Sequence, residues 1–411
     1  MAEFTRDSIK HIIDTKFNTF NAENKLLSPD DNILLACSGN IDSIFALHYL
    51  HSKSYNIAVA VFDHLTREGE STKDAEFVEQ VANQLGLPHF RKTVNIKSLV
   101  KDRGNFQEVA RNERYSFFEN LIQKHGFSKL ITAHHGDDNV ETVLMNMGRA
   151  SGIKGMRGIL PKSDKIIRPF LCLRKNEIEA FVELNDIQFR KDFSNDSSDY
   201  KRNYFRNKVI PLIEEKDEFW VQQSMQSINH LREWGEEIEA ISSALITIDK
   251  ELIQIDLKQL LQKLKPELYL YHILSKYGFN MVQVEEILAS TQVGKKWNAE
   301  DYLCYRERES IDLFNERILD KVETYTFDQE IPRIGKLRLE DLYTNKNILV
   351  PEKLALEELE IRHKKTGDFI CFKHGKKKLK KFFTDEKWSN FRKQRSFVVA
   401  KGNEIYWLEG L

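Results

Sequence analysis

Cysteine is scarce in this 411-residue chain, and no two cysteines form a CxxC pair. The four cysteines, which lie far apart in the sequence, are Cys37, Cys172, Cys304 and Cys371. A disulfide scaffold, a zinc ribbon and a cysteine-ligated iron–sulfur cluster are therefore not expected, and a reducing, cytoplasmic environment is predicted.

Long apolar runs are also missing. No stretch approaches the ~20 consecutive apolar residues that cross a bilayer, so no membrane partner is expected. The N-terminal segment carries acidic residues, and we do not expect it to be a signal peptide. It predicts a helix whose apolar side is formed by Phe4, Ile9, Ile12, Ile13 and Phe17.

The charge of the chain is nearly balanced but unevenly distributed. The formal net charge is −1, yet residues 361–395 contain 13 Lys or Arg and 3 Asp or Glu. One concentrated basic segment in a nearly neutral chain is typical of a protein that binds a polyanion.

Residues 30–210 alternate short β-rich runs with helical patterns. This alternation predicts an α/β domain with a parallel sheet covered by helices. The expected helices include residues 43–51 and 72–85. The expected strands are residues 32–37, 57–62, 89–94 and 129–135.

Two further units are expected after this α/β domain. A polar, acidic run at 214–218 interrupts the pattern, and apolar residues then recur every three or four positions from 219 to 245, as in an amphipathic helix. Short strands are expected from about residue 296. The predicted domains are an α/β domain at 1–213, a helical middle domain at 214–295 and a small α+β C-terminal domain at 296–411.

The strongest local signal is ILLACSGNIDSIFAL (33–47), a buried strand followed by a polar turn and a helix. Ligands of open α/β sheets bind beyond the carboxyl ends of the strands, and backbone amides at a helix N-terminus suit phosphate oxygens. An ordinary capped turn is the alternative. The candidate ATP-binding residues are Ser38, Gly39, Asn40, Ile41, Asp42 and Ser43, and Asp42 is also a candidate Mg²⁺ ligand.

This turn lacks the Gly-Lys-Ser/Thr of a Walker A loop. It resembles the PP-loop, SGGxDS, of ATP pyrophosphatases, which split ATP into AMP and pyrophosphate. Asn40 stands at the second glycine of that pattern. Because Asn tolerates positive φ better than other non-glycine residues, we expect the turn to keep its shape.

A second polar cluster follows the strand expected at 129–135, before a helix expected to begin near Val140. Its members are His134, His135, Asp137 and Asp138. The clustering favours a binding site. The alternative is that the acidic side chains only stabilise the N-terminus of the helix. Carboxylate oxygens suit Mg²⁺-ATP, and a transition-metal site that also uses Asp63 and His64 is the alternative.

The chain as a whole resembles the tRNA(Ile)-lysidine synthetases of the PP-loop superfamily. The segments that carry the resemblance, in the family's order, are VFDH (61–64), NFQEVARNERY (105–115), HHGDDNVET (134–142), RASGIKGM (149–156), IRPFL (167–171), DFSNDSSDYKRNYFRNKVIP (192–211) and KKTGDFI (364–370). The resemblance implies ATP-dependent ligation of L-lysine to the wobble cytidine of the CAU anticodon of isoleucine tRNA. A homodimer stays open.

The resemblance also implies the chemistry. In this family ATP adenylates the carbonyl oxygen of the cytidine and releases pyrophosphate, and the lysine ε-amine then displaces AMP. Asp42 and Asp138 would hold Mg²⁺, Arg111 would be the cation beside the reacting groups, and Glu141 would orient Asp138 or the water shell of the metal. An exposed arginine paired with Glu108 is the alternative for Arg111.

Two basic segments are candidates for tRNA contact. Arg202 and Arg206, in YKRNYFRNK (200–208), are expected to contact phosphates, although a helix that simply covers the sheet is equally consistent with the pattern. In the C-terminal segment, cations precede aromatic residues on which unpaired bases would stack. A solvated charged face packed by its own aromatics is the alternative there. These C-terminal residues are Lys377, Lys378, Lys380, Phe382, Phe383 and Trp388.

Three other functions stay open from the residues alone. A PP-loop tRNA thiolase would need suitably placed cysteines, and Cys37 and Cys172 are a poor arrangement for that chemistry. A degenerate tRNA-binding protein would have lost catalysis through Asn40. A two-metal phosphohydrolase would use the cluster of histidines and aspartates.

Overall fold

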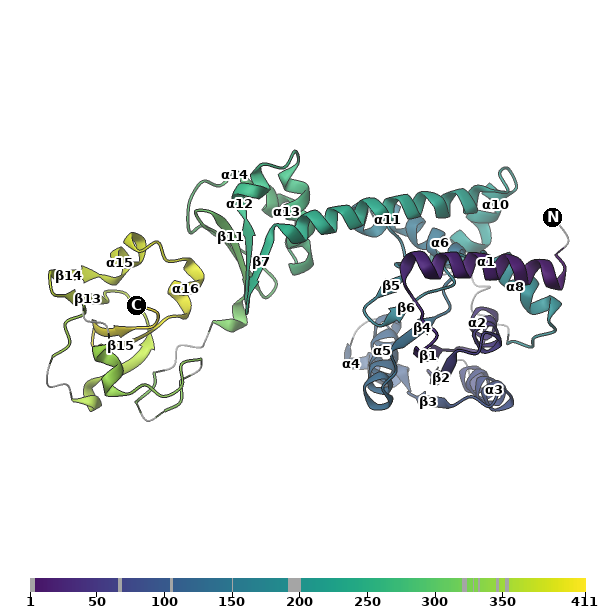
Figure 1. Cartoon of the computed structure of the whole chain (residues 1–411), viewed down its shortest axis with the longest axis horizontal. Coiled ribbons are helices and arrows are strands. Elements are labelled where there is room, and N and C mark those ends of the chain that lie inside the picture. Colours follow the sequence, from purple (N-terminus) through teal and green to yellow (C-terminus); the bar gives the residue numbers. More distant parts are fainter. Residues whose placement is uncertain are drawn as a thin grey trace. The chain divides into compact units, whose positions relative to one another are not determined.

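The computed structural model describes residues 4–65, 69–103, 106–149, 151–190, 201–319, 324–327, 329–331, 333–344, 347–351 and 355–411. Of the segments that carry the family resemblance, Asn105, Ala150 and residues 192–200 lie outside the described residues. The chain divides into two compact units, Met1–Gly235 and Glu236–Leu411. Figure 1 shows the elements of each unit.

The first unit is built on a six-stranded sheet in the order β3-β2-β1-β4-β6-β5. The strands are β1 (Asn32–Ala36), β2 (Asn56–Asp63), β3 (His89–Thr93), β4 (Lys129–Thr132), β5 (Lys162–Ser163) and β6 (Ile166–Ile167). Neighbouring strands from β3 to β6 run parallel, and β5 is antiparallel to β6. The α/β class with a parallel sheet is therefore confirmed.

Helices cover both faces of this sheet (Figure 1). The helices from α1 to α11 are α1 (Arg6–Asn24), α2 (Ile41–Ser52), α3 (Glu70–Gln84), α4 (Ile96–Arg103), α5 (Phe106–His125), α6 (Gly136–Met147), α7 (Gly152–Met156), α8 (Lys175–Leu184), α9 (Lys201–Tyr204), the π-helix η3 (Phe205–Val209), α10 (Ile210–Glu214) and α11 (Trp220–Ala244). Alternate residues of a strand face opposite layers. Ile33 and Leu35 pack with α1, α2 and α8, whereas Leu34 packs against α5.

The N-terminal helix is confirmed as α1. Thr5 caps it, because its hydroxyl accepts the backbone N–H of Ser8 at 3.2 Å. Ile9, Ile13 and Phe17 are buried against the sheet. No helix in the described part of the chain is long and apolar enough to cross a membrane.

The strand order places a topological switch point between β1 and β4. The chain runs outward from β1 through β2 to β3, and then returns to pair β4 with the free edge of β1. The turns that follow β1 and β4 therefore lie side by side at the carboxyl edge. In open α/β sheets this crevice is where ligands bind.

The segment after β4 differs from the sequence prediction. The strand ends at Thr132, and helix α6 begins at Gly136 instead of near Val140. The reason is a helix cap, since the backbone N–H of His135 donates to Asp138 Oδ2 at 3.1 Å. Asp137 and Asp138 thus belong to the first turn of α6.

The second unit contains two antiparallel or mixed sheets. The first has the order β7-β8-β11-β10-β9 and the second the order β12-β15-β16-β13-β14. The strands of the first sheet are β7 (Ile246–Asp249), β8 (Leu252–Asp256), β9 (Lys296–Ala299), β10 (Tyr302–Arg306) and β11 (Ser310–Asn315). Helices α12 (Leu257–Leu261), α13 (Pro266–Leu274), η4 (Ser275–Tyr277) and α14 (Met281–Ala289) accompany it.

One of the expected domain boundaries differs from this arrangement. The boundary at 295–296 cuts through the first sheet, because β11 pairs with β8 in the register Ile311↔Ile255. Past the expected boundary at 213–214, Val221 and Ile228 of α11 still pack against α6, so the first compact unit extends to Gly235. Strand pairing and helix packing join segments that look separate in the sequence.

The C-terminal part of the second unit is a small α+β fold, as expected. Its strands are β12 (Glu360–His363), β13 (Phe369–Phe372), β14 (Gly375–Lys378), β15 (Phe397–Lys401) and β16 (Glu404–Leu408). The 3-10 helix η5 (Glu316–Ile318) follows β11 and precedes this fold. The helical segments of the fold are η6 (Leu339–Tyr343), η7 (Leu356–Glu358), α15 (Leu379–Asp385) and α16 (Asn390–Arg395).

Candidate active site

The polar turn after β1 is closed by the side chain of Ser43. The Ser43 hydroxyl accepts the backbone N–H groups of Ser38 and Gly39, each at 3.2 Å, and donates to the carbonyl oxygen of Asn40 at 3.1 Å. Two amides therefore point at one oxygen position at the N-terminus of α2, where phosphate oxygens are favoured.

Gly39 and Asn40 have different tasks in this turn. Gly39 has φ +87°, and a Cβ there would lie 3.3 Å from the carbonyl oxygen of Asp74. Asn40 has φ −71°, and its Oδ1 accepts the N–H of Ser43 at 2.9 Å as the cap of α2. The expectation that Asn40 survives by tolerating positive φ is wrong, because this position is an extended helix cap.

Asp42 and Asp138 converge on the imidazole of His135. Asp42 Oδ1 lies 3.7 Å from Nε2 of His135, and Asp138 Oδ2 lies 3.5 Å from the same nitrogen. Burial by itself would lower the pKa of His135, but the neighbouring carboxylates, with Asp138 the strongest, raise this pKa to about 9. A positive group thus separates two carboxylates that would otherwise repel each other.

Asp138 and Glu141 are held by two arginines from the segment that follows α8. Arg206 donates to Asp138 Oδ1 at 2.7 Å and to Glu141 Oε1 at 2.6 Å, and Arg202 donates to Glu141 Oε2 at 2.8 Å. Burial opposes ionisation of Asp138, yet the charges of His135 and the arginines hold its pKa well below the usual range. Arg202 and Arg206 are thus engaged inside the site, and their expected contact with tRNA stays a prediction.

The sequence did not single out Lys175 or Arg174, which complete the network. Lys175 Nζ lies 2.6 Å from Asp42 Oδ1, and Arg174 Nε donates to Asp137 Oδ1 at 3.2 Å. Lys175 is the first residue of α8 and Arg174 is its N-cap. Lys175 follows Asp42 by 133 residues in the sequence. No local pattern marks such a pairing, because the packing of α8 against α2 creates it.

Arg111 lies on the exposed side of α5, and its guanidinium stacks on the ring of Tyr115 at 4.6 Å. Within the described part of the chain it forms no ion pair with Glu108. Two other arginines, Arg114 and Arg168, lie close to it. Burial lowers the pKa of both, and the positive charge of Arg111 lowers these pKa values further. Arg111 is therefore part of a cationic cluster with no direct bond to Asp42 or Asp138.

The alternative metal site is not formed. Asp63 is fully buried and accepts hydrogen bonds from Arg91 at 2.8 Å, Ser71 at 2.8 Å and Thr72 at 3.0 Å. Among the described residues, no group of three or more His, Cys, Asp or Glu side chains is arranged to hold a metal ion. A pair of carboxylates facing substrate phosphates is instead the usual protein contribution to a Mg²⁺ site.

The cysteines near this edge of the sheet do not have the properties that a tRNA thiolase would need. Cys37 and Cys172 are free thiols; Cys37 lies in the hydrophobic core of the first unit and Cys172 packs against that core. Burial raises the pKa of both, that of Cys172 to about 12. A nucleophilic cysteine needs a depressed pKa, so neither thiol has the expected character.

Comparison with known proteins decides between the remaining functions. Residues 9–213 match a PP-loop domain, and residues 248–316 match a TilS substrate binding domain, the latter close to the limits of the β7–β11 sheet. A tRNA(Ile)-lysidine synthase from Bacteroides thetaiotaomicron is 31% identical over 94% of this chain and 92% of that protein. The chain belongs to the tRNA(Ile)-lysidine synthase family.

Other relatives agree with this assignment. A second tRNA(Ile)-lysidine synthase, from Parabacteroides distasonis, is 31% identical over 94% of the chain and 92% of its own length. Among solved structures, the U34-tRNA thiolase NcsA from Methanococcus maripaludis has a TM-score of 0.45 at 16% identity, over 55% of this chain and 80% of that chain. That likeness is too distant to indicate an activity. As a member of the lysidine synthase family, the chain is an ATP-dependent, lysidine-forming ligase.

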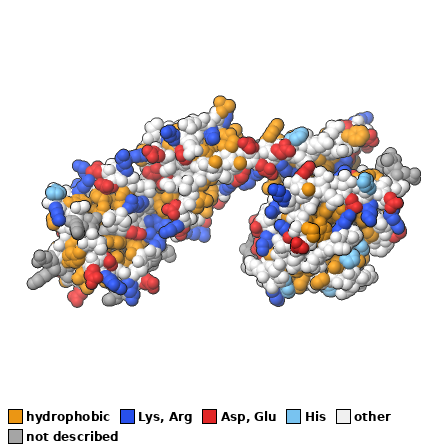
Figure 2. Space-filling model, in the orientation of Figure 1, with side chains coloured by type: hydrophobic (Ala, Val, Ile, Leu, Met, Phe, Trp, Pro, Cys, Tyr) orange, Lys and Arg blue, Asp and Glu red, His pale blue; other side chains and the backbone are white. Residues whose placement is uncertain are grey.

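In this lysidine synthase the basic C-terminal segment differs from the stacking surface that we expected. Phe382, Phe383 and Trp388 are buried in the core of the C-terminal fold, so bases cannot stack on them. Lys377 pairs with Asp385 at 2.7 Å, whereas Lys378 and Lys380 are exposed. On the face in Figure 2, Lys and Arg side chains are interspersed with acidic ones, as on a solvated charged surface.

Proposed function

We propose that this lysidine synthase joins the ε-amine of L-lysine to the wobble cytidine of the CAU anticodon of isoleucine tRNA, with Mg²⁺-ATP as the activating substrate. The observation that supports this proposal best is the convergence of Asp42 and Asp138 beside the phosphate-binding turn, at the β1/β4 switch point. The free cysteines fit a reducing cytoplasm as its setting.

ATP would lie with its phosphates over the turn of residues 38–43. The amides of Ser38 and Gly39, which now share the Ser43 hydroxyl, would donate to phosphate oxygens, and the N-terminus of α2 would favour their negative charge. Asp42 and Asp138 are the residues that would hold Mg²⁺. When bound, the ion would neutralise phosphate charge and polarise the phosphoryl group.

The chemistry has two steps. The carbonyl oxygen of the cytidine forms a bond with the α-phosphorus, and the bond to pyrophosphate breaks. The neutral ε-amine then attacks the carbon of the activated cytidine, AMP leaves with the oxygen, and the nitrogen loses a proton. Arg111, with Arg114 and Arg168 beside it, would offset the negative charge that builds on the phosphate.

The arginines of the segment 201–209 would keep the carboxylates in position. Each guanidinium has five N–H donors, and Arg202 and Arg206 use several of them on Asp138 and Glu141. Donors that remain would be available to a tRNA phosphate. Lys378 and Lys380 are exposed cations that would contribute to tRNA affinity in the second unit.

One incubation tests the proposal. The full chain is mixed with ATP, Mg²⁺, L-lysine and isoleucine tRNA bearing a CAU anticodon. The tRNA is then digested to nucleosides, which are analysed by mass spectrometry. We expect lysidine to form, with one pyrophosphate released for each lysidine. ATP turnover without lysidine, or RNA binding without ATP turnover, would contradict the proposed reaction.

A further inference from the structure

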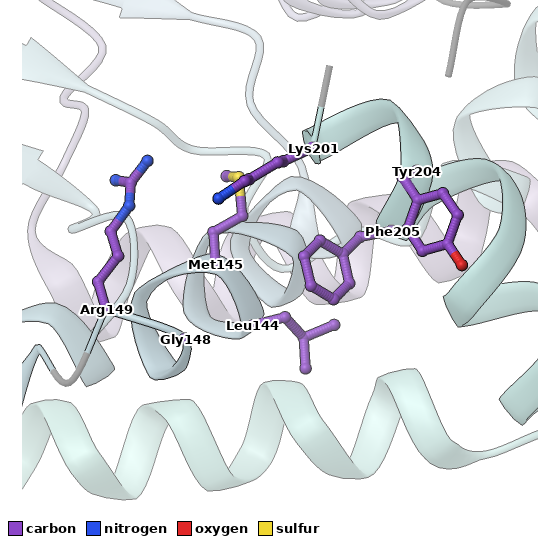
Figure 3. A pocket seen from close by; sticks show the side chains of 7 residues that line it. All are labelled: Leu144, Met145, Gly148, Arg149, Lys201, Tyr204 and Phe205. Atoms are coloured by element: carbon purple, nitrogen blue, oxygen red, sulfur yellow. The ribbon is translucent and has the colours of Figure 1, made fainter. Parts of the chain in front are cut away.

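A cavity of about 430 Å³ opens on the first unit beside the catalytic carboxylates. It lies between the C-terminal half of α6 and the segment formed by α9 and η3 (Figure 3). Its lining residues are Leu144, Met145, Gly148, Arg149, Lys201, Tyr204 and Phe205. The volume is in the range of sites that enclose a small organic group.

The cavity begins about one turn beyond Glu141 along α6, since Leu144 and Met145 line it. Asp138, Glu141 and Met145 are spaced three and four residues apart, so they share one face of this helix. From Glu141 to Met145 the helix rises by only about 6 Å. On the opposite wall, Arg202 reaches Glu141 while its chain neighbour Lys201 lines the cavity.

The lining combines two kinds of chemistry. Lys201 and Arg149 supply positive charge, and Figure 3 shows the Lys201 ammonium directed toward the side of Arg149. Phe205 faces Leu144 in the same view, and the residue Tyr204 is 52% exposed. Within the described part of the chain, neither Lys201 nor Arg149 has an acidic partner, and two cations on one lining suit an anion.

A nucleotide has the matching chemistry, an aromatic base joined to a phosphate. Proteins that hold single-stranded RNA stack its bases on aromatic side chains and neutralise its phosphates with Lys or Arg. We propose that this cavity binds one nucleotide of the anticodon loop adjacent to the reacting cytidine, with its base against Tyr204 and Phe205 and its phosphate at Lys201 and Arg149. The inference rests on the proposed function, because the cavity would help to hold the cytidine at the carboxylates.

The first test separates this subsite from the reaction itself. Tyr204→Leu and Lys201→Gln are compared with the parent chain in steady-state lysidine formation. We expect each to raise KM for tRNA about tenfold, the size of one lost stacking or phosphate contact, while KM for ATP and for lysine stay within about twofold. An unchanged KM for tRNA would overturn the proposal, and the parent chain must form lysidine for the comparison to apply.

Two control variants sharpen the result. Tyr204→Phe keeps the ring and removes only the hydroxyl, so we expect it to behave as the parent chain does. Lys154→Gln removes an exposed cation of α7 that does not line the cavity, and it should leave KM for tRNA unchanged. Equal effects of Lys154→Gln and Lys201→Gln would mean that only overall charge matters, which contradicts a subsite.

A second test identifies the nucleotide. Anticodon stem–loop RNAs carry an abasic residue at one position flanking the cytidine, and their affinities are measured with the parent chain and with Tyr204→Leu. At one position we expect the abasic substitution to lower the affinity of the parent chain but not that of Tyr204→Leu. The missing base and the missing ring would remove the same contact, so their effects would not add. Losses that add at every position would overturn the assignment. A change of oligomeric state in Tyr204→Leu would instead indicate a second copy of the chain as the occupant.

Discussion

Asp42 and Asp138 approach the same nitrogen atom, Nε2 of His135, at 3.7 and 3.5 Å. The two aspartates come from turns that are distant in sequence, and the parallel pairing of β1 with β4 brings those turns together. Carboxylates that share a buried cation repel each other when the cation is absent. We therefore expect this pair to be the part of the site most sensitive to substitution.

Asp42→Asn and Asp138→Asn should each lower kcat for lysidine formation by at least about 100-fold, the usual loss when one charge-stabilising group is removed. At position 138 Asn keeps an oxygen that can accept the N–H of His135, and at both positions Asn has nearly the shape of Asp, so the fold should persist. The dissociation constant for tRNA should stay within about twofold. Comparable loss of tRNA affinity in both variants would contradict their assignment to the Mg²⁺-ATP site.

Asn40→Gly restores the glycine of the PP-loop pattern and should be nearly neutral. Asn40 has a negative φ, so glycine gains no backbone advantage, and replacing a cap by glycine costs only a few tenths of a kcal/mol. Asn40→Ala should cost about 1 kcal/mol. Melting temperatures and KM for ATP check both variants, and a large gain in kcat for Asn40→Gly would show that the asparagine impairs the turn.

Gly39→Ala should raise KM for ATP and lower the melting temperature of the first unit. The residue has φ +87°, a conformation that costs a non-glycine residue about 1–2 kcal/mol, and the new Cβ would press on the carbonyl oxygen of Asp74. Gly86→Ala is the matched control, since Gly86 also has positive φ but has nothing within 4 Å of an added Cβ. It should show the stability loss without the change in KM.

Lys378→Gln and Lys380→Gln should weaken tRNA binding and make it less dependent on salt. Each lost phosphate contact is expected to reduce the slope of log K against log salt concentration by about one. Lys377→Gln should have a smaller effect, because Lys377 already pairs with Asp385. Filter binding at several salt concentrations measures the slopes, and equal slopes for all three variants and the parent chain would rule out this surface.

Asp368→Ala should destabilise the second unit by about 3–5 kcal/mol, because it leaves a buried arginine without its counter-charge. Arg362 is fully buried and donates to both carboxylate oxygens of Asp368, at 2.9 and 3.0 Å. Glu360→Ala removes an exposed partner of the same arginine and should cost far less. Denaturant unfolding of the full chain measures both, and equal losses would refute the buried pair as the cause.

Local patterns in the sequence were sufficient to predict much of the first unit. The four parallel strands, the helix at the N-terminus and the polar turn after β1 all appear where apolar periodicity places them, because strand and helix periods depend on neighbouring residues. Boundaries set by side-chain caps were less well predicted. The start of α6 depends on the hydrogen bond of Asp138 to His135, which periodicity does not encode.

The sequence by itself determined the α/β class, the polar turn after β1 and the family, since these depend on residue types in short, ordered segments. Only the tertiary structure decided which charged side chains meet. Arg202 and Arg206 turn toward Glu141, Lys175 reaches Asp42, and Phe382 lies inside a core where an exposed stacking surface was expected. Each of these outcomes depends on how distant helices and strands pack, and a charged or aromatic residue has the same local pattern whether packing directs it toward the interior or toward solvent.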